Sequence, residues 1–73
     1  MSTEVVRSAV EFGAAIKRAR RAAGLTQRSL ALAVGAGERF IVELERGKGT
    51  SHLGKALETA VALGVRVELK IQA

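Results

Sequence analysis

The chain has 73 residues and a formal net charge of +5, with twelve lysines and arginines against seven acidic residues, all of them glutamate. A chain of this length forms one domain with a small core, and the absence of cysteine excludes disulfides and thiolate metal sites. The basic excess favours a polyanionic partner, although a merely solubilising surface would give the same charge.

The first predicted element is a helix that follows an irregular arm at residues 1–7. Ser8 and Glu11 have the spacing of a capping box, so we expect this helix to begin near Ala9 and to end before Gly24. Apolar residues recur three and four positions apart along it and predict its buried face. These residues are Phe12, Ala15, Ile16, Ala19 and Ala23.

Two short helices joined by a tight turn are predicted next. Thr26 is a typical N-cap for a helix that ends at Val34, and Leu25 is expected to pack just before it. The sequence Gly-Ala-Gly at 35–37 then permits the left-handed backbone of a turn between helices. A third helix is expected from about Glu38 to Arg46. The predicted buried residues of the pair are Leu30, Ala31, Val34, Ile41 and Leu44.

The last part of the chain changes its apolar period. Ser51 predicts the N-cap of a fourth helix over His52–Leu63, which ends before Gly64. Its predicted buried residues are Leu53, Ala56, Leu57, Ala60 and Leu63. The period then falls from 3.6 to 2, which predicts a half-buried strand within residues 65–73. The apolar positions of this strand are Val65, Val67, Leu69 and Ile71.

The second and third helices carry a recognisable motif. Its residues are Leu25-Thr26-Gln27-Arg28-Ser29-Leu30-Ala31, Val34-Gly35, Ile41, Leu44-Glu45 and Gly47-Lys48. This pattern resembles the helix-turn-helix of the lambda-repressor and Cro (XRE) family. With the string Arg39-Phe40-Ile41 and Glu43-Leu44-Glu45-Arg46, a fourth helix and a terminal strand, the chain is similar to HipB-type antitoxins and their regulator relatives over roughly residues 12–71.

The resemblance implies an all-α fold, a four-helix lambda-repressor-like helix-turn-helix domain over residues 8–64. A C-terminal dimerisation strand would follow at 65–73. An unpaired strand leaves its amides and carbonyls without partners, so we expect a second copy to pair with it across a dimer. The predicted interface is Val65, Val67, Leu69 and Ile71, packed over Leu57, Val61 and Leu63. The alternative is pairing with the arm around Val5 and Val6 of the same chain.

The third helix is predicted to read DNA bases. If Ile41 and Leu44 face the core, the 100° rotation per residue turns the intervening polar face outward, where a recognition helix enters the major groove. Arginine can read guanine, glutamate can accept from cytosine, and valine can contact the thymine methyl group. The predicted base contacts are Gly37, Glu38, Arg39, Val42 and Glu43. A solvated surface is the alternative for the arginines, but it does not explain an exposed Val42.

Backbone contacts and one internal ion pair follow from the same resemblance. Gln27 matches the family glutamine that contacts a phosphate at the groove edge. The predicted phosphate contacts are Gln27, Arg28, Arg46 and Lys48. Arg20 is expected to pair with Glu45 between the first and third helices, as a structural ion pair that positions them.

Nothing in the sequence indicates an enzyme, a metal site or a cofactor. His52 is the only histidine, without aspartate or cysteine to converge on it, and we expect it to be simply the first residue of the fourth helix. No apolar run approaches the roughly 20 residues of a membrane span and the N-terminus lacks a signal-like stretch, so we expect a cytoplasmic protein without membrane contact.

Two functions are consistent with these sequence features. The leading hypothesis is a homodimeric repressor that binds a palindromic operator in double-stranded DNA. The second is an antitoxin whose main task is to neutralise a HipA-like kinase toxin, with DNA binding as autoregulation. Single-stranded RNA binding is disfavoured because both phenylalanines are expected to be buried, which leaves no aromatic surface for stacking.

Overall fold

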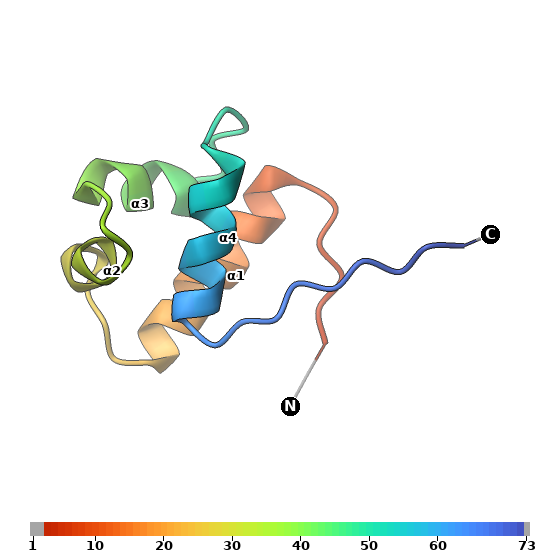
Figure 1. Cartoon of the computed structure of the whole chain (residues 1–73), viewed down its shortest axis with the longest axis horizontal. Coiled ribbons are helices and arrows are strands. Elements are labelled where there is room, and N and C mark those ends of the chain that lie inside the picture. The colour runs from red at the N-terminus through yellow and green to blue at the C-terminus, as the bar shows by residue number, and fades with distance from the viewer. Residues whose placement is uncertain (1–2, 73) are drawn as a thin grey trace.

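Four helices make up the regular structure in the computed structural model, which describes residues 3–72. They are α1 (Ala9–Ala22), α2 (Gln27–Val34), α3 (Glu38–Glu45) and α4 (Leu53–Ala62). Helices α2 and α3 lie together on one side of the molecule, and the C-terminal segment extends away on the opposite side (Figure 1). The predicted all-helical class with four helices is confirmed. Residues 1–2 of the predicted arm and residue 73 lie outside the described part.

Helix α1 begins where the capping pattern predicts. The Ser8 side chain accepts a hydrogen bond from the Glu11 amide at 3.1 Å. The Glu11 carboxylate accepts from the amide of Arg7 at 2.5 Å, not from that of Ser8 as in a capping box. At the other end, Ala23 is exposed, so its predicted burial is wrong. Ala23 is the C-cap of α1, where the chain leaves the helix and the helical period no longer applies.

The core lies between the four helices and is built from small aliphatic side chains. Its buried members are Ile16, Leu30, Ala31, Ile41, Leu44, Ala56 and Ala60. Thr59 is also fully buried, and its hydroxyl donates to the carbonyl of Lys55 at 2.8 Å, which satisfies the polar atom. Phe12 and Phe40 pack at the edge and are only half-buried, contrary to expectation. Both rings are large, and a core of this size encloses only part of each.

Helices α1 and α3 cross in close contact at Gly13. A Cβ atom at this position would overlap the backbone carbonyl oxygen of Leu44 and lie 2.9 Å from that of Glu45. Glycine costs about 1 kcal/mol relative to alanine inside a helix. Glycine is nevertheless required at this position, because only a residue without a side chain lets the two backbones approach so closely.

The turn between α2 and α3 follows the predicted glycine chemistry. Gly35 adopts the left-handed conformation at φ +66° and is the C-cap of α2. The next amide, that of Ala36, donates to the Ala31 carbonyl at 2.9 Å and closes the helix end. Lys55 of α4 donates its ammonium to the Val34 carbonyl at 3.1 Å, so a cation from another helix also binds the last turn of α2.

Helix α4 begins one residue later than predicted. His52 is the N-cap, and its ring Nδ1 accepts from the Lys55 amide at 3.1 Å, so Ser51 is not the cap. Leu53 and Leu57 are exposed, contrary to the predicted buried face. The buried face of α4 instead consists of Ala56, Thr59 and Ala60. These small residues allow α4 to pack closely on the core, which leaves the larger leucines outside it.

No strand is formed anywhere in residues 3–72, although a strand was predicted near the C-terminus. The Val65 amide donates to the Ala60 carbonyl at 2.9 Å, and beyond this bond the chain runs as an exposed segment. Leu69 and Ile71 are 87% and 89% exposed. No backbone hydrogen bond joins this segment to residues 3–7, so the described chain supplies no partner strand. None of the described helices is long and apolar enough to cross a membrane.

The close α1–α3 contact can be tested with Gly13→Ala. We expect this substitution to lower the free energy of unfolding by about 1–3 kcal/mol, because the added methyl group forces the two backbones apart. Gly54→Ala is the control, since Gly54 is also helical but a Cβ there meets only the exposed ring of His52. Urea denaturation followed by circular dichroism measures both. Equal changes in the free energy of unfolding for the two substitutions would contradict a requirement for glycine at the α1–α3 contact.

Candidate nucleic-acid interface

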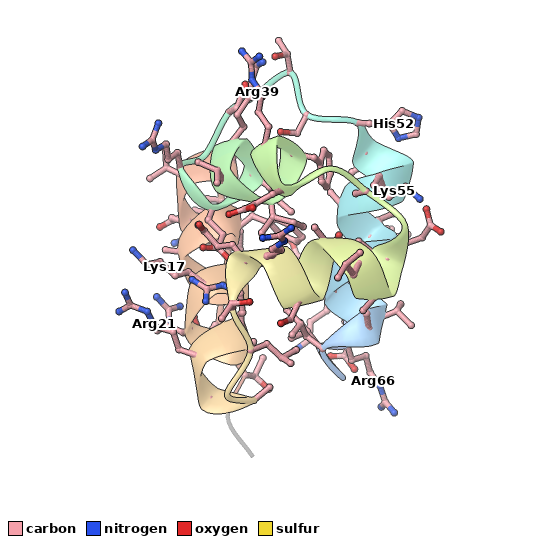
Figure 2. All side chains as sticks on the ribbon, turned by 90° about the vertical axis from the view of Figure 1, so that its left-hand side faces the viewer. Lys17, Arg21, Arg39, His52, Lys55 and Arg66 are labelled. Carbon is pink, nitrogen blue, oxygen red and sulfur yellow. The ribbon has the colours of Figure 1, made fainter. Side chains whose placement is uncertain are left out.

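Helix α3 has one buried and one outward face. Ile41 and Leu44 are buried, and the Arg39 side chain is 89% exposed and points away from the helices (Figure 2). Val42 and Glu43 are half-buried, so Val42 is less exposed than predicted. Both flank the buried row closely enough for neighbouring atoms to cover part of each side chain. The outward face is therefore a mixed surface, with Arg39 extending furthest from it.

The starts of α2 and α3 carry four further predicted contact residues. Gln27 and Arg28 form the first turn of α2, where Arg28 is exposed and Gln27 is half-buried. Gly37 is the N-cap of α3 and provides no side-chain cap, and Glu38 follows it in the exposed first turn. The helix-turn-helix brings these positions into the same half of the molecule as the outward face of α3.

The Glu45 carboxylate connects three helices. Arg20 of α1 donates to it twice, from Nε to Oε2 at 2.6 Å and from Nη2 to Oε1 at 3.1 Å. Gln27 of α2 donates its amide to the same Oε1 at 3.1 Å. The remaining Arg20 nitrogen, Nη1, donates to the Leu25 carbonyl at 2.8 Å. The hydrogen bond to Glu45 raises the pKa of Arg20, so this guanidinium stays charged although it is buried.

The involvement of Gln27 and Leu25 was not foreseen from the sequence. Family resemblance placed Arg20 against Glu45 but assigned Gln27 to phosphate alone. A local signal was present, because a glutamine in the first turn of α2 lies next to the segment that Arg20 binds. The Glu45 side chain is only 2% exposed, so its charge is compensated by the donors of Arg20 and Gln27 and not by water.

A second ionic cluster lies on the outward side of α3. Lys48 Nζ binds Glu43 Oε2 at 2.5 Å, and Arg39 Nε lies 3.4 Å from Glu43 Oε1. The hydrogen bond from Lys48 lowers the pKa of Glu43, and the charge of Arg39 adds to this effect. The free protein thus brings together three residues that were predicted to contact DNA separately. Arg39 and Glu43 were predicted at bases, and Lys48 at a phosphate.

Several basic side chains on the surface differ from these in their surroundings. Arg46, at the end of α3, is exposed and makes no ion pair within residues 3–72. Lys17 and Arg21 extend from α1 along one side of the view in Figure 2. His52 lies at the start of α4, where it is the N-cap already described (Figure 2). Within the described part of the chain, no three potential metal ligands come together.

Comparison with known proteins shows similarity at the level of sequence. Residues 16–70 match the profile of the family HTH_3, described as helix-turn-helix. The uncharacterized HTH-type transcriptional regulator y4mF of Sinorhizobium fredii (strain NGR234) is 36% identical over 64 residues, which cover 88% of this chain and 84% of that protein.

Similarity to solved structures concerns the fold. A HipB variant in a complex with an O2 20mer superposes with a TM-score of 0.87 at 22% identity, covering 99% of this chain and 100% of that one. HipB in a HipA-HipB-O2-O3 complex gives a TM-score of 0.85 at 21% identity, covering 97% and 100%. The four-helix arrangement is therefore shared almost end to end with these chains.

The Arg20–Glu45 pair is expected to couple α1 to α3. In a double-mutant cycle with Arg20→Met and Glu45→Gln, each single change leaves a buried polar partner uncompensated, and we expect an interaction of at least about 0.5 kcal/mol. Arg18 and Glu4 form an exposed pair on α1 and the arm, and serve as control. Their coupling should fall at or below about 0.5 kcal/mol. Chemical denaturation gives all four stabilities, and strict additivity at Arg20 and Glu45 would contradict the coupling.

Proposed function

The chain belongs to the HTH_3 helix-turn-helix family, and from this premise we propose that it is a transcriptional repressor that binds operator DNA in the cytoplasm. The observation that carries the proposal is the outward face of α3, with an exposed Arg39 on a helix that α1 and α2 hold in place. An α-helix of this kind fits the major groove of double-stranded DNA. Such a function requires no catalytic group.

The proposed contacts divide into base readout and backbone positioning. Those to bases come from α3 and its N-cap: Gly37, Glu38, Arg39, Val42 and Glu43. Those to phosphates come from Gln27, Arg28, Arg46 and Lys48. The bond from Gln27 to Glu45 is compatible with this role, because a primary amide carries two N–H donors and only one is engaged.

A footprint on the DNA upstream of the protein's own gene tests the proposed function. Protection of an inverted repeat, with half-sites about one helical turn apart, is the expected result for a dimer with two recognition helices. Absence of any protected site there, and equal affinity for all duplexes in a selection from random sequences, would refute sequence-specific repression.

We also propose that two copies pair through their C-terminal segments. The segment presents Val67, Leu69 and Ile71 to solvent, and the exposed Leu57 and Val61 lie on α4. An alternating apolar segment without a partner strand favours an isologous pairing, in which each copy supplies the strand that the other lacks. Such a dimer would hold two α3 helices at a fixed separation.

A second function, that of an antitoxin, is favoured by one observation. The fold matches that of HipB in a complex that also contains HipA, with a TM-score of 0.85. Under this proposal a HipA-like kinase is a further partner, and DNA binding serves autoregulation. The test is a kinase reading frame adjacent to the gene, followed by measurement of the purified kinase with and without this protein. Loss of kinase activity supports the antitoxin function, and unchanged activity contradicts it.

Arg39 and Arg46 should affect DNA binding in different ways. Arg39→Ala is expected to weaken operator binding by about 1–3 kcal/mol and to relax the preference at one base pair in each half-site. Arg46→Gln should weaken operator and random DNA alike and reduce the salt slope of binding by about one unit. Fluorescence anisotropy titrations at several salt concentrations measure both. Equal losses on both DNAs for Arg39→Ala would reassign Arg39 to a phosphate contact.

The dimer can be tested without disturbing the core. Leu69→Gln combined with Ile71→Gln removes apolar surface that is exposed in the single chain, so the helical domain should keep its stability. We expect sedimentation velocity to show a monomer and operator binding to weaken strongly. Leu32→Gln on α2 is the control, since Leu32 is also a largely exposed leucine and lies outside the proposed interface. A double variant that remains a tight dimer would refute the pairing.

A further inference from the structure

The half-buried carboxylate of Glu43 lies between two cations on the DNA-facing side of α3. Its side chain is 28% exposed, against 89% for Arg39 and 50% for Lys48. The carboxylate offsets one of the two positive charges, so the trio carries a net charge of only +1. A surface intended solely to attract phosphates would not place an acid between its cations.

Lys48 is held to Glu43 at two points. Its ammonium binds the Glu43 carboxylate, and its backbone amide donates to the Glu43 carbonyl at 3.1 Å. The backbone bond fixes the start of the loop after α3, so the lysine side chain begins close to the carboxylate. The hydrogen bond from Lys48 and the charge of Arg39 lower the pKa of Glu43 from its ordinary value, so the ionised carboxylate is favoured by the two cations beside it.

Arg39 lies beside the same carboxylate, with its Nε 3.4 Å from Glu43 Oε1. The Arg39 side chain is 89% exposed, so its guanidinium remains accessible and can donate in parallel to guanine O6 and N7. A carboxylate beside Nε restricts the rotamers of a long side chain that is otherwise fully solvated. The arrangement favours readout of a base over loose contact with the backbone.

We propose that Glu43 determines specificity by holding Lys48 and Arg39 against α3, which weakens binding to random DNA more than binding to the operator. The proposal rests on the function proposed above. On random DNA, affinity comes almost entirely from phosphate contacts, and a phosphate must displace the carboxylate before it can engage Lys48. On the operator, Arg39 gains a guanine without leaving Glu43.

Glu43→Gln tests this role because glutamine keeps the shape of the side chain and removes its charge. We expect affinity for a random duplex to rise about fivefold, and the salt slope to steepen by up to about one unit as Lys48 becomes free to bind a phosphate. Operator affinity should change less, so the ratio of operator to random affinity falls.

Glu58→Gln is the matched control. Glu58 lies on α4, where its carboxylate is 3.3 Å from the ammonium of Lys55, so the substitution changes net charge and breaks an ion pair in the same way. We expect it to leave the ratio within about twofold, because long-range charge effects are screened at physiological salt. Equal effects of the two substitutions would overturn the proposal in favour of net charge alone.

Other outcomes separate this proposal from the function on which it rests. A wild-type protein without operator preference would overturn both. Normal operator binding with an unchanged ratio in Glu43→Gln would overturn only the role of Glu43. Loss of operator affinity with unchanged random affinity would leave Glu43 only the base contact proposed above and would overturn its role in holding Lys48 and Arg39.

A second measurement needs no DNA. Lys48→Gln should raise the pKa of Glu43 towards its ordinary value, as followed by NMR titration of the side-chain carboxyl carbon in the free protein. An unchanged pKa would show that Lys48 does not hold the carboxylate in solution and would overturn the proposal.

Discussion

The buried carboxylate of Glu45 is the contact on which the geometry of the helix-turn-helix depends. It accepts hydrogen bonds from α1 and α2 and is itself part of α3, so one charged group fixes three helices relative to one another. The aliphatic core beside it contains only small and medium side chains, which set few directional constraints. The directional hydrogen bonds to Glu45 orient the three helices. Gly13 allows the backbones of α1 and α3 to approach closely enough for these bonds to form.

The two ionic clusters of α3 differ in burial and therefore in consequence. At Glu45 the carboxylate is shielded from water, and removal of a partner leaves an uncompensated charge that destabilises the fold. At Glu43 the partners are solvated, and such pairs contribute little to stability. An exposed pair can still matter at a surface that meets a polyanion, because it alters the charge that the polyanion encounters. Under our proposal, Glu45 and Glu43, two residues apart on one helix, serve folding and recognition separately.

The helical elements were predictable because their local signals agree with one another. Ser8, Thr26 and Gly35 cap their helices as their chemistry dictates, and the apolar period of α2 and α3 identifies their buried faces. Helix α4 was less predictable because its sequence is apolar on several sides. The buried face of α4 consists of alanine and threonine. Which face is buried depends on how closely another helix approaches, and the apolar period does not indicate this distance. The Glu43 cluster was also hidden, since Lys48 lies outside the helix and its reach depends on the loop.

The C-terminal segment leaves apolar side chains uncovered in the single chain. The helical domain has a small core, and small domains bury a low fraction of their surface. Leucine, isoleucine and valine remain exposed on the segment and on α4, where solvation of apolar surface is unfavourable. In the dimer that we propose, covering these residues would stabilise each copy and set the distance between the two α3 helices. Folding and operator spacing would then depend on the same contact, and a loss of pairing would weaken both together.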